Sequence, residues 1–338
     1  MDKQATLKDI AKLANVSIAT VSRVVNGTAT KAARPEIQNR IWEAVKELNY
    51  VPNIAAQKLK SKEPKAKLKT IACIFSRSSD FKTDPFFSEI SRSIETELLR
   101  LGYLMKFAVS TYEYPRRTIN SLLSSEHLDG VIIVGRTEKK YIDLIKKYNK
   151  NVIYVGLNKM DIDIDQIICD GYEAAIKALE YLTRDGIENI YYLGESRQEV
   201  RYDAFRDFMG KRGLVDGLRN YVIETPFSLQ KGYENLKKAL AAGIRPRGLF
   251  CGNDLTALGA IKALNEFNLK IPEDVSIISI DNIEMAQFST PMLTTVSVPM
   301  EQLGRTAARY IVDKVQYNQL PITLLIPSTL IVRESTRK

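Results

Sequence analysis

From Thr70 onward, short apolar runs alternate with amphipathic stretches of helical length. A first series contains the runs IACIF, YLMKFAVS, GVIIVG and NVIYVGL, and a second contains NIYYLG, YVIET, GLFCGN and VSIISID. Apolar runs of this length between helices are typical of parallel strands that are buried on both faces. The pattern therefore predicts an α/β domain built from two doubly wound, parallel-sheet subdomains.

The order of the runs also predicts where the chain passes between these subdomains. We expect crossings near residues 165, 299 and 326. The α/β part of the chain, residues 70–338, then divides into a first subdomain of about 70–165 and 300–325 and a second of about 166–298 and 326–338. Ligands of open α/β sheets bind outside the carboxyl ends of the strands. The expected binding site is therefore a cleft between the subdomains.

The chain has 338 residues and a net charge of +9, and most of that excess lies near the N-terminus. Residues 1–65 hold 12 Lys and Arg against 6 Asp and Glu, whereas the other 273 residues have a net charge of only +3. A solvated helical surface explains this distribution, and so does a phosphate-binding DNA reader. Charge alone leaves both interpretations open, so the choice depends on a motif.

Three features bear on the cellular compartment. No run of eighteen apolar residues is present, and the N-terminal MDKQATLKDIAKLANVS lacks the apolar core of a secretory signal. Cys73, Cys169 and Cys251 lie far apart in apolar, strand-like runs, without the spacing of metal ligands. We therefore predict a cytoplasmic, nucleoid-associated protein with no membrane partner, no metal and no other cofactor.

The first fifty residues predict three short helices. Thr6, followed three residues later by Asp9, gives a capping-box-like start, and apolar residues then recur at helical spacing. Ser17 can cap a second helix at residues 18–25, and Pro35 opens a third. Three short helices with a tight turn after the first are typical of a helix-turn-helix head.

The polar face of the second helix distinguishes a DNA reader from an ordinary three-helix bundle. It carries small hydrogen-bonding residues and one arginine, without the Glu/Lys pairs of a solvated helix. Small residues let a helix enter the major groove, and an arginine can bond guanine O6 and N7 together. The residues of this face are Ser17, Ala19, Thr20, Ser22, Arg23 and Asn26.

The run LKDIAKLANVSIATVSRVVNG, followed by RIWEAVKELNYVPNIAAQKLK, resembles the DNA-binding head and hinge of the LacI/GalR family of bacterial repressors. The resemblance extends over essentially the whole chain and implies a periplasmic-binding-protein-like effector domain. It makes Ile18 and Ala19 the variable base-reading pair. It assigns further DNA contacts to Thr6, Ser17, Thr20, Ser22, Arg23, Asn26 and Tyr50. Arg34 departs from the family, which usually has a capping Ser or Thr there; we expect either a weaker cap or an extra positive charge near the DNA backbone.

Residues 1–60 are expected to form this head, with a hinge helix at 53–60 that Asn53 caps and a charged linker at 61–69. In the family, the hinge helix pairs with its dimer mate and inserts a leucine into the minor groove. The resemblance gives that insertion to Leu59 and the helix–helix contact to Ala56. So short a helix is marginal in water, so its order should depend on DNA and on the effector domain. A spacer without function is the alternative.

The resemblance also indicates residues for a polar ligand. Arg201 takes the place of the family's effector-binding arginine, although Ala204 replaces the usual glycine of that motif. A carboxylate after a strand, Asp281, can hold ligand hydroxyls together with this arginine, while Phe227 covers the apolar face of a ring. Ser76 and Asn253 complete the predicted site, and for Asn253 a simple helix cap is the alternative.

The polar and aromatic segment SRSSDFKTDPFFSEI precedes the helix at Pro85, and it either lines the cleft or forms a surface loop. Its ending, DPFFSEI, is similar to galactoside-responsive family members from Gram-positive bacteria. His127 is the only histidine and is expected at a helix end. The sequence contains no Ser-His-Asp arrangement, Gly-rich phosphate loop or cysteine cluster, so we expect no enzymatic activity.

Together these observations predict a homodimeric repressor of a carbohydrate-utilisation operon that binds double-stranded operator DNA. A small sugar or sugar phosphate, for instance a galactoside, would switch operator affinity allosterically, by induction or by corepression. No leucine heptads follow the last strand, which favours a dimer over a tetramer. Two alternatives remain: a catabolite-control regulator that responds to a phosphorylated carrier protein, and a sugar-binding receptor without DNA function, which should have a signal peptide and no basic head.

Overall fold

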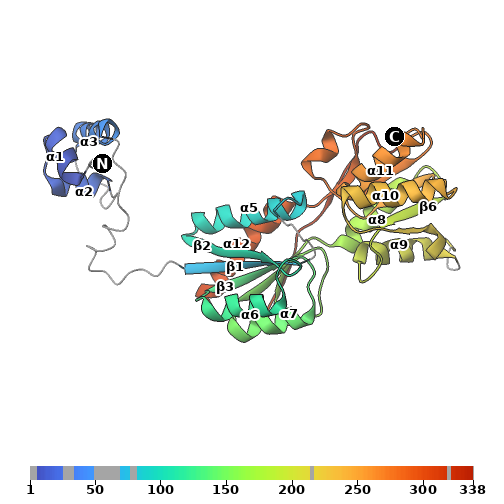
Figure 1. Ribbon diagram of the computed structural model, residues 1–338, viewed down its shortest axis with the longest axis horizontal. Helices are drawn as coiled ribbons and strands as arrows, with labels where there is room; N and C mark the ends of the chain where they lie inside the picture. The colour runs from blue at the N-terminus through green and yellow to red at the C-terminus, as the bar shows by residue number, and fades with distance from the viewer. Residues whose placement is uncertain are drawn as a thin grey trace. The chain divides into compact units, whose positions relative to one another are not determined.

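The computed structural model describes residues 6–25, 34–48, 69–76, 82–213, 217–317 and 321–337. The chain divides into two compact units, residues 1–67 and 68–338, which we call the head and the sensor domain (Figure 1). Within the described ranges, no helix has both the length and the apolar character needed to cross a membrane.

The described part of the head consists of α1 (Leu7–Leu13), α2 (Ile18–Val25) and α3 (Pro35–Glu47). The backbone nitrogen and hydroxyl of Thr6 both donate to the Asp9 carboxylate, at 2.8 and 2.6 Å, and this fixes the start of α1. One fully buried side chain from each helix, Ile10, Val21 and Ile41, meets in the centre. The predicted three-helix head is confirmed.

The first subdomain of the sensor domain is a six-stranded, entirely parallel sheet between two helical layers. Figure 1 shows α5 and α12 on one face of this sheet and α6 and α7 on the other. The strand order is β11-β5-β4-β3-β1-β2. The strands are β1 (Lys69–Phe75), β2 (Tyr103–Ser110), β3 (Gly130–Val134), β4 (Val152–Gly156), β5 (Asp165–Ile168) and β11 (Thr323–Leu325), and the helices are α5 (Pro85–Arg100), α6 (Arg116–Ser125), α7 (Lys139–Tyr148) and α12 (Met300–Gln316).

The second subdomain has the same plan, with strand order β12-β10-β9-β8-β6-β7. Its strands are parallel except β12, which runs antiparallel to β10. The strands are β6 (Ile190–Gly194), β7 (Val222–Glu224), β8 (Gly248–Cys251), β9 (Ser276–Asp281), β10 (Thr294–Ser297) and β12 (Thr329–Ile331). The helices are α8 (Gly171–Thr183), α9 (Val200–Lys211), α10 (Leu229–Ala241) and α11 (Asp254–Glu266), with the 3-10 turns η1 (Leu218–Tyr221) and η2 (Glu284–Gln287).

The chain passes between the two sheets three times. The passages follow β5, β10 and β11, and each is two or three residues long. The first passage lies after Ile168 and not at residue 165, because β5 pairs with β4 and β11 in the first sheet. The predicted boundary at 165 is therefore too early by one short strand.

A buried carboxylate holds β5 in this sheet. Asp165 is fully buried and accepts hydrogen bonds from the Tyr310 hydroxyl and the Ile322 backbone nitrogen, both at 2.8 Å. The Lys314 ammonium lies 2.5 Å from its other oxygen. Since Tyr310 and Lys314 belong to α12, this cluster joins the last long helix to the strands β5 and β11 at the sheet edge.

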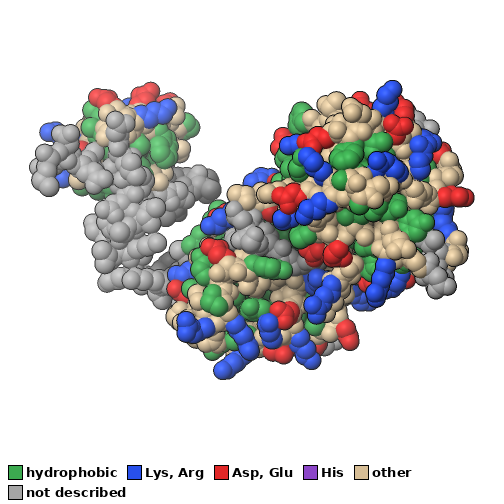
Figure 2. Space-filling view, turned by 45° about the vertical axis from the view of Figure 1, so that its right-hand side comes forward, with side chains coloured by type: hydrophobic (Ala, Val, Ile, Leu, Met, Phe, Trp, Pro, Cys, Tyr) green, Lys and Arg blue, Asp and Glu red, His purple; other side chains and the backbone are tan. Residues whose placement is uncertain are grey.

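Close helix packing in the second subdomain depends on a glycine. A Cβ atom at Gly259 of α11 would lie 2.1 Å from the Leu229 carbonyl oxygen at the start of α10. No side chain fits at that separation, so the two helices can approach this closely only with glycine there. On the sensor-domain surface, acidic and basic side chains are mixed on the face that Figure 2 shows, in keeping with the small net charge of this part of the sequence.

Candidate functional site

The outer face of α2 in the head is accessible. The Thr20 backbone nitrogen donates to the Ser17 hydroxyl at 3.1 Å, so Ser17 caps the helix as predicted. Ser17, Ile18, Ala19 and Arg23 are exposed, and Ile18 is 48% exposed despite its apolar side chain. Exposure of the apolar Ile18 side chain to water is unfavourable, and its small neighbours leave room for it to contact bases in a DNA groove.

The structure also places Arg34 and three other predicted DNA contacts of the head. Arg34 precedes α3 without a side-chain cap, which agrees with the expected weaker cap. Thr6 is bonded to Asp9 at the start of α1, and Thr20 and Ser22 are half-buried on α2. The other predicted DNA contacts, Asn26, Tyr50, Asn53, Ala56 and Leu59, lie outside the described residues.

The sensor domain contains a small cavity of about 70 Å³ where the two sheets present the carboxyl ends of their strands. Four of the five predicted effector residues, Arg201, Phe227, Asn253 and Asp281, line it together. The lining residues are Asp84, Phe86, Phe87, Gly135, Arg136, Gly156, Leu157, Asn158, Arg201, Phe227, Asn253 and Asp281. Ligand sites typically measure about 300–1,000 Å³, so a ligand of sugar size can enter only if this cleft opens.

Arg201 is fixed by a buried ion pair. Its Nε lies 2.7 Å from Oε1 of Glu199, which is fully buried, and its Nη1 donates to the Gly252 carbonyl at 2.7 Å. Its guanidinium lies 4.3 Å from the centre of the Phe227 ring. Burial alone would lower the pKa of Arg201, but the charge and hydrogen bond of Glu199 outweigh this and raise it. Arg201 is thus a permanently charged, pre-oriented donor stacked on an aromatic ring.

Asp281 ends β9 and has no hydrogen-bond partner for its Oδ1 among the described residues, although it is only 4% exposed. Burial, reinforced by the neighbouring Asp254, raises the pKa of Asp281 well above its usual range, while Arg201 acts in the opposite direction. Its backbone is left-handed, with φ at 129°. Buried polar groups without partners are rare in native proteins, so this carboxyl is a candidate for a ligand contact.

The other predicted residues have mixed roles. Asn253 accepts hydrogen bonds from the backbone and hydroxyl of Thr256 at 3.0 and 2.6 Å, so its oxygen caps α11 while its amide nitrogen remains available to the cavity. Ser76 follows β1 and is buried with no partner for its hydroxyl in the described structure, but it does not line the cavity. It lies behind Gly135, where a Cβ would be 2.5 Å from the Ser76 carbonyl oxygen.

Several cavity residues were not predicted individually. The end of the segment SRSSDFKTDPFFSEI lines the cleft through Asp84 and through Phe86 and Phe87 in the first turn of α5, whereas its residues 77–81 lie outside the described ranges. Asp84 also caps α5 by accepting from the backbone nitrogens of both phenylalanines. Arg136 and Asn158 follow β3 and β4, so the rule that ligands meet strand ends would have found them.

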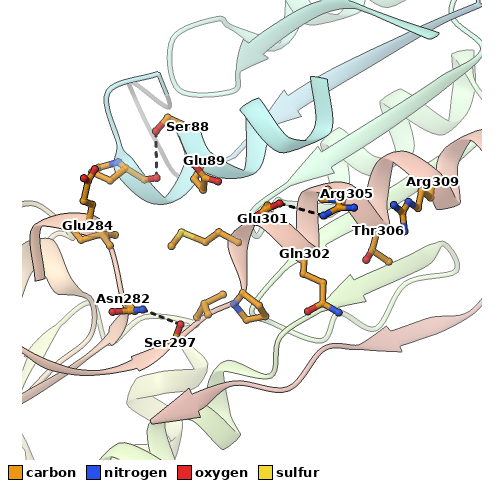
Figure 3. Close-up of a pocket in the computed structure, with 15 residues that line it drawn as sticks. Ser88, Glu89, Asn282, Glu284, Ser297, Glu301, Gln302, Arg305, Thr306 and Arg309 are labelled. Atoms are coloured by element: carbon orange, nitrogen blue, oxygen red, sulfur yellow. Dashed lines mark hydrogen bonds and ion pairs between the residues drawn. The ribbon is translucent and has the colours of Figure 1, made fainter. Parts of the chain in front are cut away.

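A larger, open groove of about 920 Å³ lies outside this cleft, between α5, α12 and the segments that follow β9 and β10. Figure 3 shows it with Glu301 bonded to Arg305 and Asn282 bonded to Ser297. It contains none of the predicted effector residues. Its two arginines already have carboxylate partners, Arg305 with Glu301 and Arg309 with Glu97, so the smaller cavity is the better candidate for a small ligand.

The remaining chemistry-bearing residues give no second site. His127 is exposed, and its backbone carbonyl accepts from the Thr70 hydroxyl at 2.8 Å. The three cysteines are buried free thiols. Across the ranges that the structure describes, no cluster of three His, Cys, Asp or Glu side chains could hold a metal ion. A helix-turn-helix head followed by a domain with a polar cavity between two subdomains defines a ligand-responsive, DNA-binding regulator.

Comparison with known proteins agrees with this class. Residues 6–53 match "Bacterial regulatory proteins, lacI family", and residues 179–336 match "Periplasmic binding protein-like domain". The chain is 31% identical over 343 residues to the HTH-type transcriptional repressor PurR of Mannheimia succiniciproducens, covering 99% of both chains. This chain belongs to the LacI family of DNA-binding transcriptional repressors.

Solved structures share the fold. The lac repressor dimer bound to operator and the anti-inducer ONPF is similar with a TM-score of 0.74 and 23% identity, over 99% of this chain and 100% of that one. A LacI family regulator from Enterococcus faecium with bound ribose has a TM-score of 0.68 and 27% identity, over 79% of this chain and 98% of that one. These relatives are regulators and not enzymes, and the matched DNA-binding head argues against a transport receptor.

Proposed function

We propose that this chain is a homodimeric repressor of a carbohydrate-utilisation operon, whose affinity for operator DNA changes when a sugar or sugar phosphate binds between the two subdomains. The observation that carries the proposal is the meeting of Arg201, Phe227, Asn253 and Asp281 in one cavity. A fixed cation, an aromatic face and an unbonded carboxyl suit a ring that carries hydroxyl groups. The ribose bound to the Enterococcus faecium relative supports a sugar as the ligand class.

The exposed face of α2 is the proposed reader of the operator. Ile18 and Ala19 would face base edges, and Arg23 would bond a guanine or a phosphate. The hinge residues 53–60, with Leu59 as the minor-groove wedge, complete the proposed interface. Such an interface requires two heads on a near-palindromic site, one for each half-site.

The proposed switch is a change in the angle between the subdomains. The cavity is smaller than a sugar needs, so ligand binding selects a different separation of the two sheets. A ligand that binds more tightly at one angle between the subdomains changes the affinity for operator DNA. Operator DNA then changes the affinity for the ligand by the same factor. The direction of that change separates induction from corepression.

Exposed apolar side chains support a dimer. Phe288 is 74% exposed, Met285 in η2 is 47% exposed and Met292 is 37% exposed, within one short stretch of the second subdomain. A cluster of large apolar side chains on a charged surface is typical of a protein–protein contact. We expect Phe288→Ser to shift the full chain toward monomer in sedimentation velocity.

A thermal-shift screen of the full chain against sugars, sugar phosphates and nucleobases tests the ligand. We expect stabilisation by at least one sugar, and loss of that stabilisation in Asp281→Ala. The stabilising sugar should also alter retention of a labelled operator fragment in a mobility-shift assay. Stabilisation by nucleobases alone would contradict the proposed ligand class.

A second candidate replaces the small ligand by a phosphorylated carrier protein. The open groove of Figure 3 favours it, because Arg305 and Arg309 are each about half exposed there, and Met300 also lines the groove. Arginine pairs with phosphate bidentately, and methionine suits adaptable protein contacts. Pull-down by a phosphorylated carrier protein, lost in Arg305→Ala and absent with the unphosphorylated form, would favour this candidate over the sugar.

A further inference from the structure

Two buried carboxyl groups lie near each other at the ligand cavity, Asp281 in its wall and Asp254 outside its lining. Asp254, the first residue of α11, is fully buried and accepts three hydrogen bonds from uncharged donors. The donors are the Ser279 hydroxyl at 2.5 Å, the Thr295 hydroxyl at 2.7 Å and the Ile283 backbone nitrogen at 2.8 Å. Burial raises the pKa of Asp254 to about 6 even though these hydrogen bonds oppose the rise.

Asp281 lies between two of those donors in the chain, Ser279 and Ile283, and therefore beside Asp254. It has no comparable set of donors, since within the described residues its buried Oδ1 is not hydrogen-bonded. The nearby cation, Arg201, is already paired with Glu199 and bonded to the Gly252 carbonyl. The charged groups that act on Asp281 are Asp254 of α11, Arg201 of α9, Glu199 just before α9, and Asp84 before α5. Arg333, after β12, acts on Asp254.

The backbone holds this carboxyl in place. Asp281 and Asn282 are both left-handed, with φ of 129° and 59°. Neither is glycine, so the backbone at this position is held in a conformation that side chains disfavour. The Asp281 carbonyl accepts from the Val298 nitrogen at 3.2 Å, and the Asn282 side chain is bonded to Ser297 and Arg333. The fold thus keeps an unbonded carboxyl at the cavity wall at a cost in stability.

We propose that Asp281 carries a proton in the ligand-free cavity at neutral pH, and that a neutral hydrogen-bond donor of the ligand replaces this proton. The inference rests on the proposed ligand site and adds its regulation. A ligand hydroxyl or N–H that donates to Asp281 favours its ionised form, so the proton leaves to solvent when the ligand binds. Only the ionised form of Asp281 would repel a phosphate or carboxylate, so the proton release proposed here requires an uncharged donor at this position.

The sign of the pH dependence follows from this exchange. At a pH below the pKa of Asp281 in the empty site, ligand binding releases one proton, so affinity rises by up to about tenfold per pH unit. Above that pKa no proton remains to be released and affinity is constant. A ligand that accepted a hydrogen bond from the protonated acid would show the opposite trend.

The proton itself can be observed without any ligand. Infrared spectra of the full chain at pH 7 should contain the C=O band of a protonated carboxyl group, absent from Asp281→Asn and retained in Asp143→Asn, whose carboxylate is exposed on α7. Thermal unfolding gives a second measure: the wild-type midpoint should fall relative to Asp281→Asn as pH rises from 5 to 8. Identical infrared spectra, or parallel unfolding curves, would overturn the protonated acid.

The exchange is tested with D-ribose, D-galactose and lactose at pH 6 and pH 8, followed by calorimetry in two buffers of different ionisation enthalpy. We expect any sugar that binds to bind more tightly at pH 8 and to release close to one proton at pH 6. Equal affinity at both pH values would remove the exchange but leave the sugar site. Binding by none of the three would count against the proposed ligand class and the exchange together. The infrared band would still show whether Asp281 is protonated in the ligand-free protein.

Discussion

Replacing Arg201 by methionine should destabilise the protein strongly, and adding Glu199→Gln should restore much of the loss. Glu199 is fully buried and the Arg201 side chain is only 7% exposed, with 2.7 Å between Nε and Oε1. Breaking a buried ion pair by removing one of its members costs about 3–5 kcal/mol. In a domain of this size each kcal/mol lowers the unfolding midpoint by about 2–4 °C, so we expect a fall of roughly 6–20 °C.

The assay is thermal unfolding of the full chain at pH 7, followed by circular dichroism. Arg206→Met is the matched control, because Arg206 lies on the same helix, is 49% exposed and pairs with exposed Asp203, so its loss should cost under about 1 kcal/mol. Equal destabilisation by Arg201→Met and Arg206→Met, or no recovery on adding Glu199→Gln, would refute the reasoning. The double variant is also the better test of ligand contact, since it separates lost binding from lost folding.

Three further predictions concern the head and the packing of the sensor domain. Arg23→Ala should abolish specific operator retention in a mobility-shift assay and leave ligand-induced stabilisation unchanged; retained specificity would remove Arg23 from the interface. Gly259→Ala should lower the free energy of unfolding by about 1–3 kcal/mol, because its Cβ would overlap the Leu229 carbonyl. Gly210→Ala, where a Cβ meets nothing within 4 Å, is the control and should be neutral or stabilising in the same urea titration. Arg100 and Arg309 donate hydrogen bonds to Glu97 and lower its pKa to about 2. The stability that this carboxylate adds is therefore present above about pH 4.5 and is lost as the pH falls toward 2. In Glu97→Gln the free energy of unfolding should depend less on pH between 5 and 3, and an unchanged pH dependence would contradict this.

The head helices and the strands within the eight apolar runs were predictable from local pattern, whereas four other short strands were not. The head helices and the eight long apolar runs carry their signal within a few residues. The strands β5, β10, β11 and β12 have only three or four residues each and contain polar side chains. Asp165 opens β5 and is buried because Tyr310 and Lys314, almost 150 residues away, supply its partners. No local pattern contains that information.

In the candidate site too, some residues could be predicted from the sequence, and others depend on contacts that only the structure shows. Three residues of the cavity wall were predictable, because the family resemblance indicates Arg201 and Phe227 and the end of a strand indicates Asp281. Phe86 and Phe87 read as apolar positions of an amphipathic helix, and only the structure brings the first turn of α5 against the cavity. The unbonded state of Asp281 was also beyond the sequence, since it depends on Asp254 taking the nearby donors.

The three short passages between the sheets also limit how a signal can leave the cleft. Passages of two or three residues are too short to let the two subdomains slide far past one another or move apart as separate bodies. We therefore expect the two halves to move chiefly by a change in the angle between them, with the passages as the hinge. A ligand therefore controls one angular coordinate, and substitutions in the passages should change the size of the response without altering which sugars are recognised.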